Sequence, residues 1–115
     1  METVEKEFFV RAVHQIVKMV PTGRATSYGA IAKAIGYPNN SRMVGAVMAQ
    51  TSQSEKIPAH RVVNSQGVLS GREAFGTPSR MQELLEEEGI RVVNNRISNW
   101  KKVFWNPIDE ITINQ

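Results

Sequence analysis

The chain lacks cysteine entirely and has only two histidines, His14 and His60, among its 115 residues. The first absence excludes disulfide bonds, thiolate metal sites and cysteine nucleophiles, and two histidines are too few for an ordinary zinc site. No apolar run approaches the roughly 20 residues that span a bilayer, and the first residues lack the basic-then-apolar layout of a signal peptide. We therefore expect a cytoplasmic protein that carries no metal or cofactor and contacts no membrane.

Charge is unevenly distributed along a chain of ordinary globular composition, with 41% apolar and 22% charged residues. The length suits one domain over residues 1–115. Between residues 11 and 80 there are nine basic residues against Glu55 and Glu73, whereas the whole chain carries only +3, so the flanks are net acidic. A basic middle suits a polyanion-binding face, although a solvated surface explains the same pattern.

Three helices are predicted in the first half. Residues 3–20 have apolar residues at helical spacing, which predicts a helix with one buried face. His14 does not lie on that face, so we expect this histidine to be solvated. Residues 28–35 form a second helix, capped by Thr26 or Ser27 and ended by Gly36, and Ser41 caps a third that runs to about Gln50. Two short helices joined by a tight turn predict a helix-turn-helix.

The second half mixes short elements. We expect a hairpin of residues 62–64 and 68–69, a surface loop over 70–76, and a helix opened by Thr77-Pro78 and ended by Gly89. We expect residues 90–115 to form an ordered segment that packs over the domain, with the last few residues frayed. The predicted fold is mainly α with a short β-hairpin.

The third helix has small residues at Gly45, Ala46 and Ala49. A glycine inside a helix costs about 1 kcal/mol relative to alanine. Such a helix lets another group approach its backbone closely, and both a neighbouring helix and a nucleic acid are candidates.

Residues 58–62 read Pro-Ala-His-Arg-Val. This motif resembles the reactive site of the O6-alkylguanine-DNA alkyltransferases, with alanine where those proteins have their nucleophilic cysteine. The methyl group of Ala59 has no lone pair and no ionisable proton, so it accepts no alkyl group. The chain resembles the alkyltransferase-like proteins, which bind alkylated guanine in DNA and repair nothing themselves. The resemblance covers about residues 8–92, leaves 93–115 as an extension, and implies a winged-helix-like DNA-binding domain.

The resemblance implies how the chain meets DNA. In the family the helix-turn-helix enters the minor groove, where small residues such as Gly45 and Ala46 suit a narrow approach. Arg42 matches the arginine that fills the space of an extruded base, and Tyr28 matches the tyrosine that crowds the 3′ phosphate. Ser41 completes the expected DNA contacts.

The same resemblance implies a lesion pocket. The residues expected to line it are Tyr28, Ala59, Val62, Leu69, Ser70, Gly71 and Arg72. Ser70 and Gly71 match a loop that meets the flipped guanine, and Arg72 matches an arginine that lies on the base face as a cation–π contact. Leu69 replaces a tyrosine that donates toward O6 during alkyl transfer.

Three further residues match a cysteine-activating relay. His60 and Glu88 correspond to its histidine and glutamate, and Arg61 follows in the motif. With the nucleophile gone, we expect all three to support the pocket rather than to catalyse. Thr51 stands where the family has a hinge asparagine.

These features predict a monomeric, non-enzymatic sensor of O6-alkylguanine in double-stranded DNA that flags lesions for nucleotide excision repair proteins. It would act on the nucleoid of a bacterium or in a eukaryotic nucleus. A true alkyltransferase whose cysteine was replaced by alanine is the main alternative. A sequence-reading winged-helix regulator is a weaker one, because Gly45, Ala46 and Val47 offer no polar base-reading side chains.

Overall fold

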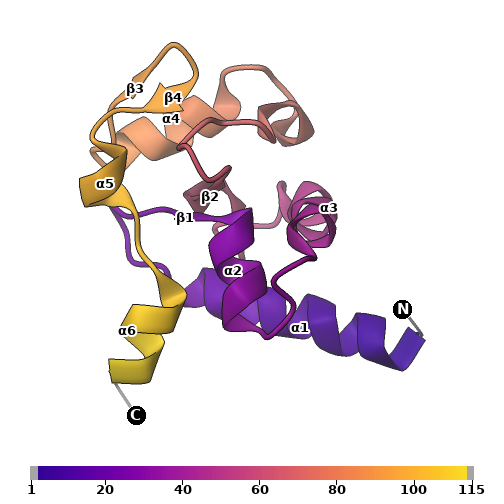
Figure 1. Ribbon diagram of the computed structural model, residues 1–115. Coiled ribbons are helices and arrows are strands. Elements are labelled where there is room, and N and C mark those ends of the chain that lie inside the picture. Colours follow the sequence, from indigo (N-terminus) through magenta and orange to yellow (C-terminus); the bar gives the residue numbers. More distant parts are fainter. Residues whose placement is uncertain (1–2, 114–115) are drawn as a thin grey trace.

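The computed structural model describes residues 3–113 and is mainly helical, as expected; this part of the chain also contains one short antiparallel hairpin (Figure 1). In chain order the elements are α1 (Thr3–Met19), β1 (Thr26–Ser27), α2 (Tyr28–Ala34), α3 (Ser41–Thr51), the 3₁₀ turn η1 (Ala59–Arg61), β2 (Val62–Val63), the 3₁₀ turn η2 (Arg72–Phe75), α4 (Arg80–Glu87), β3 (Val92–Val93), β4 (Arg96–Ile97), α5 (Trp100–Val103) and α6 (Pro107–Ile113). Within this part of the chain, no helix has the length and apolarity needed to cross a bilayer.

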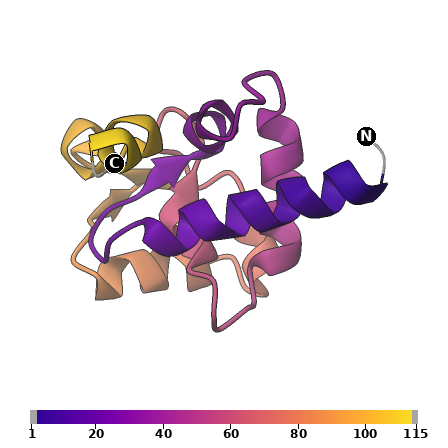
Figure 2. The ribbon, with the colours of Figure 1, turned by 90° about the horizontal axis from the view of Figure 1, so that it is seen from below.

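Helix α1 runs along one side of the molecule (Figure 2) and buries its predicted stripe. Phe9, Val13 and Val17 are at most 1% exposed and pack in one cluster with residues of α2 and α3. Helix α2 begins as predicted, because the Ser27 side chain accepts a hydrogen bond from the Ala30 amide at 3.1 Å. Gly36, at φ +87°, follows its end.

His14 is partly buried rather than solvated, which corrects the sequence prediction. Its Nε2 lies 3.1 Å from Thr51 Oγ1, and Thr51 Oγ1 donates to the Val47 carbonyl at 2.6 Å. The histidine therefore connects α1 to the last turn of α3. Burial, and then the nearby charge of Lys18, lower the pKa of His14.

The hairpin predicted over residues 62–69 forms only next to its turn, where the Asn64 amide donates to the Val68 carbonyl at 3.1 Å, and the strand pairing predicted for Val62 and Val63 is wrong. Val62 and Val63 are both buried, and they pair in parallel with Thr26 and Ser27 instead of with Val68 and Leu69. The chain does reverse after Val63, where the Asn64 side chain accepts from the Gln66 and Val68 amides. A parallel partner distant in the sequence cannot be read from local turn residues.

The actual hairpin joins β3 to β4, with Val92 opposite Ile97 and Val93 opposite Arg96. Its two turn residues, Asn94 and Asn95, have φ of +51° and +63°. Asparagine tolerates the left-handed conformation that a tight hairpin turn requires, so this pair was a usable sequence signal that we missed.

Two helix starts also differ from the sequence predictions. Asn40 is the residue that precedes α3, without a side-chain cap, and Ser41 is its first helical residue. Helix α4 starts at Arg80 rather than at Pro78, because a separate turn, closed by the Arg80 amide and the Thr77 carbonyl, comes first. The predicted end of α4 is confirmed, since Gly89 follows it at φ +84°.

The C-terminal segment packs on the rest of the described chain. Trp105 is 5% exposed and belongs to the same core cluster as α1. Its amide donates to the Ala25 carbonyl at 2.7 Å, and the Arg24 guanidinium donates to the carbonyls of Val103 and Phe104. The fraying predicted at the very end falls partly on residues 114–115, which lie outside the described range.

Candidate nucleic-acid interface

Four of the five residues predicted to contact DNA surround one shallow depression. Tyr28 at the start of α2 and Ser41, Arg42 and Gly45 on α3 line it together with Ser70 and Gly71, and its volume is about 330 Å³. The Arg42 side chain is exposed, so its guanidinium is available to a ligand. Ala46, the fifth residue, is exposed on α3 beside Gly45 but does not line the depression.

Gly45 is not required by packing inside the protein. A Cβ atom built there would meet Tyr28 Cδ1 at 3.9 Å, which is ordinary van der Waals contact, and nothing nearer. This removes one of the two explanations for a glycine inside α3, namely close approach of a neighbouring helix. What remains is close approach by something outside the fold.

A smaller cavity of about 140 Å³ adjoins the depression. Both spaces are lined by Tyr28, Gly45, Ser70 and Gly71. The cavity is further lined by Met48, Ala49, Ala59, Val62, Glu73, Ala74 and Phe75. Ala59 forms part of its wall and is only 3% exposed.

Tyr28 and the loop after Leu69 fit closely together. A Cβ on Gly71 would lie 2.7 Å from the Tyr28 hydroxyl oxygen, so any larger residue at 71 would force a shift. Burial raises the pKa of Tyr28, and a hydrogen bond with Ser70 offsets this only partly. The phenol therefore stays protonated near neutral pH and offers an O–H donor.

Two predicted pocket residues lie elsewhere. Leu69 is 1% exposed and packs in a second core cluster with Val63, Met81 and Leu85, so it does not line the cavity. Arg72 is exposed at the start of η2 and lines neither the cavity nor the depression. Leu69 is turned inward because its amide donates to the Asn95 carbonyl at 2.9 Å, directly after Val68 forms a β-bridge with the C-terminal hairpin.

Several lining residues were missed from the sequence. Met48 and Ala49 of α3 and Phe75 of η2 carry no chemical signature of a site. The helical spacing from Gly45 to Met48 and Ala49 is the signal that could have found two of them, because residues three and four apart share a helix face.

Glu88, the residue directly after α4, is the centre of a charged cluster. It accepts hydrogen bonds from His60 Nε2, from Arg61 Nε at 3.0 Å and from the Gly23 amide at 2.9 Å. Burial works to raise the pKa of Glu88, but the hydrogen bonds from Arg61, His60 and Gly23 outweigh it and hold the pKa below its usual value. Glu88 is thus an ionised anchor.

Arg61 extends this anchor to the end of α1. Its Nη1 donates to the Val20 carbonyl at 2.9 Å and its Nη2 to Thr22 Oγ1 at 3.0 Å. Since Ala59, His60 and Arg61 form one 3₁₀ turn, fixing the last two also fixes the wall residue Ala59. The structure brings His60, Arg61 and Glu88 together next to Ala59.

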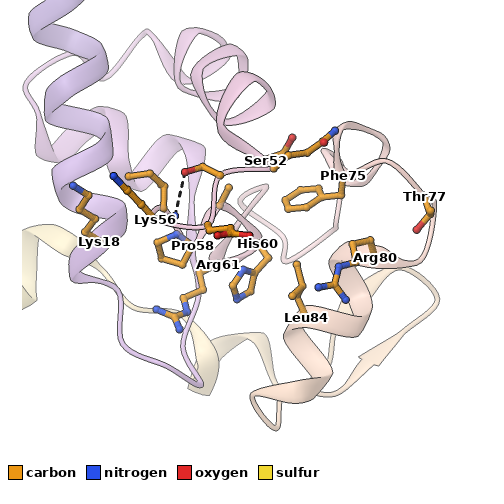
Figure 3. A pocket seen from close by; sticks show the side chains of 15 residues that line it. Lys18, Ser52, Lys56, Pro58, His60, Arg61, Phe75, Thr77, Arg80 and Leu84 are labelled. Carbon is orange, nitrogen blue, oxygen red and sulfur yellow. Dashed lines mark hydrogen bonds between the residues drawn. The ribbon is translucent and has the colours of Figure 1, made fainter.

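A larger groove has a volume of about 960 Å³, and Figure 3 shows the side chains that line it. It shares Ala59 and Phe75 with the cavity. Lys18 of α1, Lys56 in the segment after α3, and Arg80 of α4 give the groove a basic lining, in which Glu55 is the acidic residue. Among residues 3–113, no group of three or more histidine, aspartate and glutamate side chains is arranged to hold a metal ion.

Comparison with known proteins agrees with this geometry. The family described as "6-O-methylguanine DNA methyltransferase, DNA binding domain" matches residues 8–90. Alkyltransferase-like protein 1 of Schizosaccharomyces pombe is 32% identical over 88% of this chain and 96% of its own length. The DNA base-flipping protein of Escherichia coli is 35% identical over 91% of this chain and 81% of its own.

A solved structure gives the same result. S. pombe Atl1 in complex with damaged DNA containing O6-carboxymethylguanine superposes with a TM-score of 0.77 at 31% identity, over 91% of this chain and 98% of that one. The predicted fold, a DNA-binding domain with a helix-turn-helix, is thereby confirmed. The chain belongs to the alkyltransferase-like proteins, within the family of the 6-O-methylguanine DNA methyltransferase DNA-binding domain.

Proposed function

We propose that this protein recognises O6-alkylguanine in double-stranded DNA by placing the helix-turn-helix in the minor groove and flipping the damaged nucleotide into the cavity. The observation that carries the proposal is the buried Ala59 in the cavity wall, at the position of the family's nucleophile. The chain has a cavity at this position, but it lacks the sulfur atom that reacts in the alkyltransferases. Such a site binds a lesion and cannot accept its alkyl group.

Each of the five residues expected to contact DNA has a role in this proposal. Arg42 enters the base stack, where its planar guanidinium fills the vacated space and bonds the orphaned base. Tyr28 presses on the backbone at the 3′ phosphate, and because its phenol is neutral it does so without charge repulsion. Ser41, Gly45 and Ala46 let α3 lie close to the strands.

The cavity then holds the base. Ser70 and Gly71 meet the flipped guanine, while Ala59 and Val62 leave room for the O6 substituent. Arg72, exposed at the start of η2, moves over the base face to make the cation–π contact. His60, Arg61 and Glu88 hold the wall in place.

Selectivity comes from the cost of extrusion. A pair weakened by O6 alkylation is cheaper to open than a sound pair, and the opened base then gains the contacts of a shaped pocket. Affinity for undamaged DNA comes from phosphate contacts and falls with salt.

The absence of alkyl transfer is directly testable. The protein is incubated with a duplex that contains O6-methylguanine, and both the complex and the intact mass of the protein are followed. We expect a stable complex, unchanged protein mass and full recovery of the lesion. A gain of one methyl group by the protein would contradict the proposal.

The Ala59→Cys variant separates a sensor from a disabled enzyme. Leu69 stands where the alkyltransferases have a proton donor, and it is buried in the core, so the restored cysteine should take up alkyl groups poorly. Efficient uptake by Ala59→Cys would instead identify the chain as an alkyltransferase that has lost only its cysteine.

We also propose that the protein acts as a monomer and hands the marked site to nucleotide excision repair proteins, on the nucleoid of a bacterium or in a eukaryotic nucleus. Co-purification of such proteins with the lesion complex, but not with the free protein or the sound duplex, is the expected result. Equal recovery from all three would contradict the hand-over.

A further inference from the structure

We propose that the C-terminal hairpin and α5 position the lesion loop. We define the latch as Asn95, Arg96, Ile97 and Trp100, and the lesion loop as Ser70 and Gly71. The inference rests on the proposed function, and it assigns a role in lesion recognition to a segment beyond residues 8–90, which the family match covers. The latch residues are positioning residues and need not touch DNA.

The latch pairs with the backbone that leads into the lesion loop. Trp100 Nε1 donates to the Ser65 carbonyl at 3.0 Å, and Arg96 Nε donates to the Gln66 carbonyl at 2.9 Å. The Ile97 amide donates to the Gly67 carbonyl at 2.9 Å. Three successive carbonyl groups are thus held by the latch.

Trp100 also covers Gly67. A Cβ built on Gly67 would lie 3.0 Å from Cγ and Cδ2 of the indole ring, and the residue has φ +82°. Both the close approach and the backbone conformation require glycine. The indole therefore fixes the turn through contact as well as through its hydrogen bond.

The pairing continues to the residue before the lesion loop. The Leu69 amide donates to the Asn95 carbonyl at 2.9 Å, and Val68 forms a β-bridge with Arg96. The Leu69 side chain packs in the same core cluster as Ile97. Only after Leu69 does the chain leave the latch and enter the cavity wall.

Ser70 and Gly71 are consequently held between two supports. On one side is the latch, through Leu69, and on the other is Tyr28, which hydrogen-bonds Ser70 and abuts Gly71. A shift of the turn by a fraction of an ångström would move the loop against Tyr28 or away from the base. Since binding of the flipped base depends on this placement and binding to phosphates does not, the latch should govern selectivity.

The test compares Trp100→Ala with Lys101→Ala, an exposed neighbour on α5. Affinity is measured for an O6-methylguanine duplex and for the same duplex with guanine. We expect Trp100→Ala to lower the ratio of the two affinities about threefold to tenfold, in line with one lost hydrogen bond and its packing. Lys101→Ala should leave the ratio unchanged. A purely structural role would weaken binding to both duplexes alike.

Hydrogen exchange of the free protein provides an independent readout. We expect Trp100→Ala to speed exchange of the Leu69 and Ile97 amides, and Arg96→Ala, an exposed change that removes a single hydrogen bond, to do so to a smaller degree. Faster exchange with a lowered ratio supports the latch. Unchanged exchange, or an unchanged ratio in folded Trp100→Ala and Arg96→Ala, overturns it.

The two readouts also separate this inference from the proposed function. If the wild-type protein binds both duplexes equally, the proposed function fails and the assigned role of the latch in recognition fails with it. If the wild type prefers the lesion and Trp100→Ala keeps that preference, only the latch fails.

Discussion

Replacing Gly45 by alanine should make the protein more stable and a weaker DNA binder at once. Gly45 lies inside α3, where alanine is favoured over glycine by about 1 kcal/mol. The added methyl group meets only Tyr28 Cδ1, at 3.9 Å, so no steric cost within the fold offsets this gain. For a domain of this size the melting temperature should rise by roughly 4 °C.

The effect on binding has the opposite sign. If α3 enters the minor groove with Gly45 against the DNA, the methyl group occupies space that the backbone of the nucleic acid needs. Forcing a methyl group into a close-packed contact typically costs about 1–3 kcal/mol, which corresponds to a loss of roughly fivefold to 160-fold in affinity.

The assay pairs thermal unfolding with fluorescence anisotropy on lesion-containing DNA. Gly29→Ala is the matched control for stability, because Gly29 is also a helical glycine with nothing within 4 Å of its Cβ position. A Gly45→Ala protein that binds DNA as tightly as the wild type would refute the placement of α3. A fall in melting temperature would refute the claim that the fold tolerates a methyl group there.

Three further changes test other parts of the site. Arg42→Ala should lose lesion selectivity together with affinity in the same anisotropy assay, whereas an equal loss on damaged and sound DNA would make Arg42 a simple phosphate contact. Tyr28→Ala should weaken lesion binding while circular dichroism shows the fold intact; unchanged binding would leave Tyr28 a packing residue alone. Glu88→Gln should make the stability of the protein depend less steeply on pH in the acid range. The pKa of Glu88 is lowered in the folded protein, so its carboxylate stabilises the fold above its unfolded-state pKa of about 4.5. This contribution is lost as the pH falls through the folded-state pKa. Parallel acid limbs for the two proteins would contradict the ionised anchor.

The local features of the site could be predicted from the sequence. Ser27 predicts the start of α2, and the spacing of small residues predicts the open face of α3. The five-residue motif at 58–62 places Ala59 beside His60 and Arg61. Each of these depends on residues within a turn or two of one another. Features that depend only on residues close together in the chain can be predicted from the sequence.

The sequence predictions that were wrong concern features determined by residues far away in the chain. Val62 and Val63 pair with Thr26 and Ser27, so their apolar character indicated burial correctly but gave no partner. Leu69 faces the core because the C-terminal hairpin holds it there.

The prediction that His14 is solvated was wrong for the same reason, because its hydrogen-bond partner Thr51 is on another helix. A helical periodicity separates the apolar face from the rest, but it does not say which polar side chain another helix will cover.

The central claim is that the cavity beside Ala59 distinguishes a damaged guanine from a sound one. The most direct test is equilibrium binding, by fluorescence anisotropy at near-physiological salt, to one duplex carrying O6-methylguanine and to the same duplex carrying guanine. We predict that the lesion duplex binds at least about tenfold more tightly, a difference of roughly 1.4 kcal/mol. Equal affinities would mean that the cavity takes no part in recognition, and they would contradict the account.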